Sequence, residues 1–358
     1  MKIWVISDTH LGQRNGNKRW QAIANDCYDK FMMPLFREKA SNGDVLVHCG
    51  DVFDNRQSIN IGAINDAVRW FEGFSDTFSC VYVLCGNHDT RDVNSTDVSS
   101  LECLKHIKGV NVIKTQKREK VGGAVVNFVP WQNDDAVLKE WLGIGGDYTF
   151  CHAEVYGAKM NYSGVRSEHG VRDLSVKNIY SGHIHYRQSH GNVVFVGSPY
   201  AMTMGDVGND KGVYSIDLST GEVEFHKNNV SPTFVKIKKA DFAGDVESLS
   251  RAYANKFVEI AIDADDINDT AFVRLVTAVG ELGEVCDIRM NVAHSIIEDA
   301  EVKSGWDNGE SVSLNEMMGR YVRLTMVNRE EGEVDEVLSR CGVILDRLGD
   351  VTNNDISI

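Results

Sequence analysis

The chain begins with three short apolar runs, at residues 2–7, 44–48 and 80–85, and each run stops at a polar loop. Residues 17–40 place apolar side chains at helical spacing, and a second helix is predicted over residues 60–74. Strands that alternate with helices usually pair in parallel, so the pattern predicts a largely parallel sheet. Ligands of such sheets bind outside the carboxyl ends of the strands, where all three polar loops lie.

Beyond about residue 110 the apolar runs become shorter, and we expect them to form a second sheet that packs on the first. After Pro232 the composition turns acidic, which indicates a domain boundary near residues 231–236. Residues 256–292 then predict a small unit of strand, helix and strand. The strands assigned to the second sheet cover residues 110–113, 125–130, 149–152, 179–181, 193–197, 212–217 and 223–226.

Charge and composition exclude several classes of protein. The 358-residue chain has a net charge of −15, and most of this charge lies in its last third, which therefore forms no nucleic-acid surface on its own. No run of 18 apolar residues predicts a membrane span, and the first residues resemble a strand rather than a signal peptide. Eight cysteines without paired spacing indicate free thiols, so we expect a cytoplasmic protein with no membrane contact.

The polar loops carry the residue types that bind transition metals. A single Asp-x-His pair is a weak signal, a lone histidine is more often structural, and Gly-Asn-His-Asp at residues 86–89 also suits an ordinary turn. Five such sites at successive strand ends favour a centre for two metals. Mixed carboxylate, imidazole and amide donors suit manganese, iron or zinc better than magnesium. The polar residues concerned are Asp8, His10, Asp51, Asn87, His88, His152, His183 and His185.

These motifs together resemble the five-part signature of the calcineurin-like metallophosphoesterases. The resemblance implies an α/β (α+β) fold, a two-sheet β-sandwich flanked by helices, with a dinuclear metal centre. It implies that Asp51 bridges the two metals, which we expect to be manganese, with magnesium as the alternative. One metal would be held by Asp8, His10, Asp51 and His185, and the other by Asp51, Asn87, His152 and His183.

The same resemblance assigns His88 to catalysis rather than to metal binding. His88 would face the transition state and stabilise charge or protonate the leaving oxygen. Asp54, three residues beyond Asp51, would orient His88, and a solvated turn residue is the alternative interpretation. Within residues 86–89, Gly86 is expected to serve the turn and Asp89 to cap the segment that follows.

Finer motifs are similar to the exonuclease subunit of SbcCD-type recombination and repair complexes, above all to the phage-encoded members. They include 129–131 (Val-Pro-Trp), 197–200 (Gly-Ser-Pro-Tyr), 205–206 and 211–212. Cys151 departs from the family, in which many members have Gly before the histidine. The resemblance implies a nuclease domain at 1–232, a small α/β capping domain at 233–294 that helps to bind DNA, a linker at 295–311, and C-terminal helices at 312–358.

In that family the C-terminal helices bind an SMC-like coiled-coil ATPase subunit, and the nuclease forms a homodimer within a heterotetramer. An apolar stripe suits such binding, although it could also pack on its own domain; it includes Leu314, Met317, Met318, Tyr321 and Val322. DNA phosphates could be contacted by exposed basic residues, for which a solvated face is the alternative. They are Arg14, Lys18, Arg19, Lys159 and Arg166.

The sequence therefore predicts a metal-dependent DNA exonuclease and endonuclease, the nuclease half of a complex that processes double-strand breaks. In a phage-encoded protein it would act in the host cytoplasm. A phosphoprotein or nucleotide phosphatase on the same fold is one alternative. A non-catalytic scaffold is the other, and it is disfavoured because such proteins usually lose metal ligands, whereas this chain retains all of them.

Overall fold

The computed structural model describes residues 1–292 except 93, 173, 175, 264, 265, 267 and 268, together with residues 335, 337 and 338. The chain divides into the units Met1–Ala293 and His294–Ile358, and the first is described by itself. The predicted linker, the five residues of the apolar stripe, and all of the predicted C-terminal helices except residues 335, 337 and 338 thus lie outside the described residues. No helix among the described residues is both long and apolar enough to cross a membrane. The seven described cysteines are all free.

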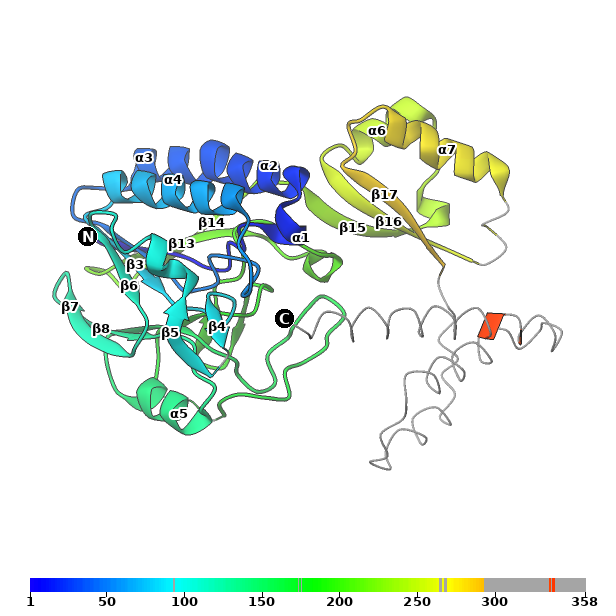
Figure 1. The fold of residues 1–358 in the computed structure, drawn as a ribbon. Helices are drawn as coiled ribbons and strands as arrows, with labels where there is room; N and C mark the ends of the chain where they lie inside the picture. Colours follow the sequence, from blue (N-terminus) through cyan, green and yellow to red (C-terminus); the bar gives the residue numbers. More distant parts are fainter. Residues whose placement is uncertain are drawn as a thin grey trace, which may run out of the picture. The chain divides into compact units, whose positions relative to one another are not determined.

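The first sheet has six strands in the order β14-β13-β1-β2-β3-β6 (Figure 1). Its strands β1, β2 and β3 are parallel, as predicted, β6 is parallel to β3, and β13 runs antiparallel to β1. The register places Ile6 beside His48 and His48 beside Val83, so the three carboxyl ends form one edge. The bounds are β1 Lys2–Ile6, β2 Val45–His48, β3 Cys80–Leu84, β6 Val110–Ile113, β13 Gly212–Asp217 and β14 Val223–Lys227.

The second sheet also has six strands, in the order β11-β12-β10-β9-β8-β7. Its inner strands β8, β9, β10 and β12 are parallel, and the edge strands β7 and β11 are antiparallel to their neighbours. The bounds are β7 Lys117–Val121, β8 Ala124–Val129, β9 Tyr148–His152, β10 Ile179–Gly182, β11 Gln188–His190 and β12 Val193–Phe195.

The assignment of strands to the second sheet was wrong in three cases. Residues 110–113, 212–217 and 223–226 form β6, β13 and β14, which extend the first sheet on both sides. A short apolar run predicts a buried strand but carries no information about its neighbour. Hydrogen bonding of β6 to β3 and of β13 to β1 is decided by tertiary packing.

Helices cover the outer face of the first sheet, and the second sheet covers its inner face (Figure 1). Alternate side chains of β1 therefore enter two cores: Trp4 packs with Phe36 and Phe78, while Val5 joins the core between the sheets. Burial on both faces explains why these strands are continuously apolar. The helices are α1 Gln13–Gly16, α2 Lys18–Asp26, a π-helical segment Cys27–Met32, α3 Met33–Lys39, α4 Ile61–Thr77 and α5 Asp135–Gly143.

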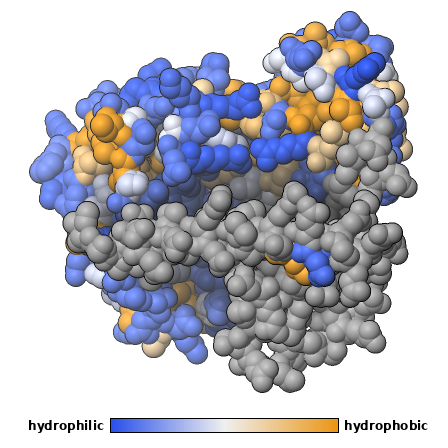
Figure 2. Space-filling view, turned by 45° about the vertical axis from the view of Figure 1, so that its right-hand side comes forward, coloured by the Kyte–Doolittle hydropathy of each residue, from blue (hydrophilic) through white to orange (hydrophobic). Residues whose placement is uncertain are grey.

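Residues 233–292 build a third, three-stranded parallel sheet, β15-β16-β17, with its own apolar core. Trp20 of α2 stacks on Phe257 of β16, with ring centroids 5.3 Å apart. Apolar surface is visible on this lobe (Figure 2), and Leu282 is among its exposed side chains. The elements are β15 Thr233–Lys238, α6 Val246–Ala252, β16 Lys256–Ile262, α7 Thr270–Glu281 and β17 Asp287–Val292; elsewhere a hairpin joins β4 Thr90–Asp92 and β5 Ser95–Ser99.

Candidate metal centre

The predicted donors follow the carboxyl ends of five strands in two sheets. Strands β1, β2 and β3 lead into the loops of the first sheet, and β9 and β10 end at the histidines of the second. Four donors have left-handed backbone angles, with φ values of 52° at Asp8, 42° at His10, 57° at Asp51 and 77° at His183. Such strain in non-glycine residues persists only where the surrounding structure enforces it, and it is typical of functional sites.

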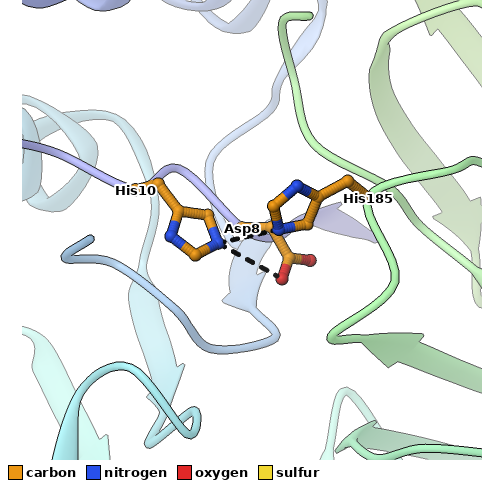
Figure 3. Close-up of side chains that lie close together, drawn as sticks. All are labelled: Asp8, His10 and His185. Atoms are coloured by element: carbon orange, nitrogen blue, oxygen red, sulfur yellow. Dashed lines mark hydrogen bonds and ion pairs between the residues drawn. The ribbon is translucent and has the colours of Figure 1, made fainter. Parts of the chain in front are cut away.

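The first group of donors comprises Asp8, His10 and His185, which converge from β1 and from the loop after β10 (Figure 3). The Nε2 atoms of His10 and His185 lie 2.9 Å apart, and Oδ1 of Asp8 lies 4.0 Å from Nε2 of His10. Asp8 Oδ1 accepts a hydrogen bond from the His183 main chain, whereas the buried Oδ2 has no hydrogen-bond partner among the described residues. A buried carboxylate oxygen without a donor suits a cation.

The second group of donors comprises Asp51, Asn87, His152 and His183. Oδ1 of Asn87 lies 2.9 Å from both His152 Nε2 and His183 Nδ1. Oδ2 of Asp51 lies 3.3 Å from His152 Nε2 and also 3.6 Å from His10 Nε2 in the first group. Asp51 is therefore the one carboxylate that faces both groups, as a bridging ligand must.

The tautomer of His152 shows that the second group fits a metal. Nδ1 lies 2.7 Å from the carbonyl oxygen of Cys49, which can only accept, so Nδ1 carries the hydrogen. The unshared pair on Nε2 then points at Oδ1 of Asn87 and Oδ2 of Asp51, and a positive charge between these atoms would relieve their repulsion. Burial disfavours a charged ring, yet the Asp51 carboxylate raises the pKa of His152 to about 9. An environment that holds a proton there also favours a divalent cation.

The Asp54 prediction needs a correction. Its carboxylate does not contact His88 but lies 3.3 Å from Nδ1 of His10, where it can orient that predicted ligand. The contact with His88 is made by the Asp54 main chain, whose carbonyl oxygen lies 2.6 Å from His88 Nδ1. This bond leaves Nε2 of His88 free to face a substrate. Burial lowers the pKa of His88, opposed by the nearby charge of Asp51.

Asp89 was expected to cap the segment that follows it, but its side chain binds the loop after β2 and the start of its own loop after β3. Its buried carboxylate accepts hydrogen bonds from four main-chain N–H groups, those of Asp51, Val52, Phe53 and Gly86, at 2.8–3.1 Å. Burial and the charge of Asp51 raise the pKa of Asp89 to about 7 against these donors. The loop after β2 is thereby fixed to the loop after β3.

Gly86 is required because the main chain at this position lies very close to the Asp51 side chain, more than because of the turn. A Cβ atom at this position would lie 2.2 Å from Oδ1 of Asp51, a distance that real side chains do not adopt. Gly86 therefore allows the GNHD loop to reach the bridging carboxylate, to which the main-chain N–H of His88 also donates at 2.7 Å.

Several supporting residues carried no distinct signal in the sequence. Buried His48 lies between Thr9 and the N–H of Gly50, and burial lowers its pKa to about 3, so it is neutral. Glu154 accepts from Ser167 and lies 3.8 Å from His183 Nε2; these partners lower its pKa to about 2. Its position two residues after His152 is the only sequence signal that could have identified it.

Residues 200–211 support the first group from far along the chain. The hydroxyl of Tyr200 donates to the Thr9 carbonyl at 2.5 Å. Lys211 is buried, pairs with Asp206, and donates to the carbonyl of His185 at 2.6 Å. These contacts give a structural role to three of the motifs that were recognised only by resemblance, at residues 197–200, 205–206 and 211–212.

The predicted DNA contacts are spread over the surface. Arg14 lies over the Trp20 ring at 4.6 Å, and Lys18 and Arg19 are exposed at the start of α2. The guanidinium of Arg166 donates to the carbonyl of Gly157, while the exposed Lys159 pairs with residue 166 in an isolated β-bridge. Their role in binding DNA stays a prediction.

Comparison with known proteins finds a relative whose sequence matches this chain over most of both lengths. Exonuclease subunit 1 of Enterobacteria phage T4 is 25% identical over 312 residues, which cover 85% of this chain and 89% of that protein. A solved archaeal phosphodiesterase matches 64% of this chain and 100% of its own, with 15% identity and a TM-score of 0.35. A protein of unknown function from Aquifex aeolicus matches 36% and 59%, with 17% identity and a TM-score of 0.21. The two structural similarities are too low to carry an argument.

The family comparison agrees with the geometry of the donors. Calcineurin-like phosphoesterase matches residues 1–187, which contain both groups of donors and His88. This match covers more than half of the chain. The chain belongs to the calcineurin-like phosphoesterase family.

Proposed function

We propose that the protein is a metal-dependent DNA nuclease that hydrolyses phosphodiester bonds with two divalent cations, of which manganese is the most suitable. The observation that carries the proposal is the position of Asp51, whose carboxylate faces both groups of donors while His88 lies directly beside it. The phage relative is named an exonuclease and matches most of both chains, which favours a nuclease over a phosphatase of the same family.

The side chains divide the chemistry among themselves. The first group would hold one cation and the second group the other, with Asp51 shared. When bound, two such cations withdraw charge from a phosphoryl oxygen and lower the pKa of water, which supplies a nucleophile at neutral pH. His88 is fixed through Nδ1 by the Asp54 carbonyl, so Nε2 faces the substrate and donates to the departing oxygen when the ring carries its second proton.

The test is a nuclease assay on linear duplex and single-stranded DNA with manganese, with EDTA as a control. Replacement His88→Ala should lower kcat about 10²–10⁴-fold, because a general acid contributes this much. Metal analysis should still find two ions in this variant. The exposed His106→Ala variant is the matched control and should keep full activity. Cleavage of monoesters without any activity on DNA would overturn the nuclease proposal in favour of a phosphatase.

We also propose that the nuclease works with an SMC-like ATPase subunit as a homodimer within a heterotetramer, in DNA repair or recombination. The relative's name, which calls it a subunit, and the predicted apolar stripe at residues 314–322 support this arrangement. Deletion of residues 305–358 should spare metal binding and abolish association with the ATPase. Undiminished co-purification of the shortened chain with the ATPase would contradict the proposal.

A further inference from the structure

The strongest positive charge of the chain lies in one short segment, residues 104–121, which the nuclease chemistry does not use. Six of its eighteen residues are basic and one is acidic, so it carries +5 whereas the other 340 residues carry −20. Six of the 37 lysine and arginine residues of this acidic protein thus stand close together in the chain. We call the surface of this segment the basic flank; its basic residues are Lys105, Lys108, Lys114, Lys117, Arg118 and Lys120.

The basic flank lies where both sheets of the sandwich end. Strand β6 is the last strand of the first sheet and β7 is the last strand of the second, and residues 114–116 connect them (Figure 1). A surface hollow of about 500 Å³ is lined by residues of both strands and by Lys105. Main-chain groups on the outer edge of β6 and β7 have no strand partner in the described part of the chain.

Half of the basic side chains form ion pairs within the protein, three lysines with two glutamates. Glu102 pairs with Lys105 and Lys114 at 2.5 and 2.9 Å, and Glu119 pairs with Lys117 at 2.5 Å. The other three are exposed and form no ion pair with any residue that the structure describes. They are Lys108, Arg118 and Lys120. Uncompensated cations on a surface favour an external polyanion.

The basic flank is also connected directly to the metal centre. The main-chain N–H of Cys85, the residue before the GNHD loop, donates to the carbonyl of Ile113 at the end of β6. The carbonyl of the next residue, Lys114, accepts from Thr96 in β5, and its ammonium donates to the carbonyl of Asp97. One end of the flank, at Ile113 and Lys114, therefore lies beside the strand that presents Asn87 and His88. Lys108 precedes the amino end of β6, and β7 runs from Lys117 to Lys120 toward the start of β8, so the unpaired cations extend from this point away from the donors.

We propose that the basic flank binds the phosphate backbone of the DNA duplex whose strand is cleaved at the metal centre. This inference rests on the proposed DNA substrate and adds a binding surface to it. Lys108, Arg118 and Lys120 each neutralise a backbone phosphate and release its counterions, so the flank contributes affinity without reading sequence. An acidic protein segment is the competing occupant.

The experiment compares two triple variants that remove the same charge. The flank variant carries Lys108→Ala, Arg118→Ala and Lys120→Ala. The control variant carries Lys139→Ala, Lys177→Ala and Arg251→Ala, which are exposed, lie outside the flank and form no ion pair within the described residues. Binding of a duplex is measured by fluorescence anisotropy between 50 and 200 mM salt, with calcium in place of manganese to prevent cleavage.

The affinity is plotted as log K against log salt, and the slope of this line should be shallower by about 2–3 for the flank variant. Each lost phosphate contact removes about 0.9 from the slope, and the variant loses three. Across a fourfold rise in salt, wild-type protein should then lose about 40-fold more affinity than the flank variant. The control variant should retain the wild-type slope. All three proteins should hydrolyse bis(p-nitrophenyl) phosphate equally, because this small diester reaches the metal centre without the flank.

If log K for DNA falls with log salt at the same slope in the flank and control variants, the inference is wrong. Loss of binding to an acidic protein segment by the flank variant, with an unchanged slope for DNA, would assign the flank to that other occupant. The outcomes separate this inference from the proposed function. If wild-type protein hydrolyses neither the small diester nor DNA, the nuclease proposal fails. If it hydrolyses both and the flank variant binds DNA with the wild-type slope, only the basic flank is excluded.

Discussion

The two groups of donors at the metal centre are supported by different parts of the chain. The first group depends on residues 200–211, since Tyr200 holds Thr9 across 191 positions and Lys211 holds the main chain of His185 across 26. The second group depends on neighbouring loops, which Asp89 joins over 38 positions. The first group therefore requires the completed first sheet with β13, whereas the second requires the ends of β2 and β3 together with His152 from β9 and His183 from the loop after β10.

The two groups also differ in how they hold charge without a metal. In the first group, an Asp8 oxygen is left without a donor and two imidazole nitrogens face each other. In the second group, His152 can take up a proton between Asn87 and Asp51. Both arrangements favour a cation, and a proton can take its place in both. Burial opposes a charged ring, yet Asp54 raises the pKa of His10 and Asp51 raises that of His152, so acid should compete with metal at both groups.

The largest effect should follow from the residue that the two groups share. Replacement Asp51→Asn removes the carboxylate that faces both, so we expect activity to fall about 10³-fold or more, at the upper end for loss of an electrostatic group. Metal analysis should find fewer than two ions. The exposed Asp76→Asn variant serves as the control. Two retained ions in Asp51→Asn would show that the groups bind independently.

A smaller effect, confined to the first group, should follow from Lys211→Met. The change leaves Asp206 buried without its cation, and loss of one partner of a buried pair costs about 3–5 kcal/mol of unfolding free energy. Denaturant unfolding measures this loss. The double variant with Asp206→Leu should be less destabilised than the single variant. If both lose the same free energy, the ion pair is not what supports the His185 loop.

The smallest of the three effects should follow from Asp89→Asn, which acts on the second group. The amide keeps one acceptor oxygen, so two of the four main-chain N–H groups lose their bonds. We expect a loss of roughly 2–3 kcal/mol of unfolding free energy, the lower end of what two unsatisfied buried donors cost at about 1–3 kcal/mol each. Titration with manganese should show weaker binding at one of two ions. Equal weakening of both would remove the distinction between the groups.

Much of the fold and the site could be predicted because strand ends are local features. An apolar run that stops at a polar loop specifies both the strand and the place where its last side chains emerge. The structure accordingly brings the predicted donors together, although their roles as ligands stay predictions. The prediction of Asp54 was wrong in detail, because three-residue spacing gives its distance from Asp51 but not the direction of its carboxylate.

By itself, the sequence determined the parallel order of the first strands, the residue types at their ends, and the concentration of positive charge in residues 104–121. Only the tertiary structure decided that β6, β13 and β14 join the first sheet, and that Asp89 and Lys211 support the two groups of donors. The physical reason is that strand pairing and buried polar contacts join residues distant in the chain. Their partners are chosen by packing, which periodicity along one segment does not encode.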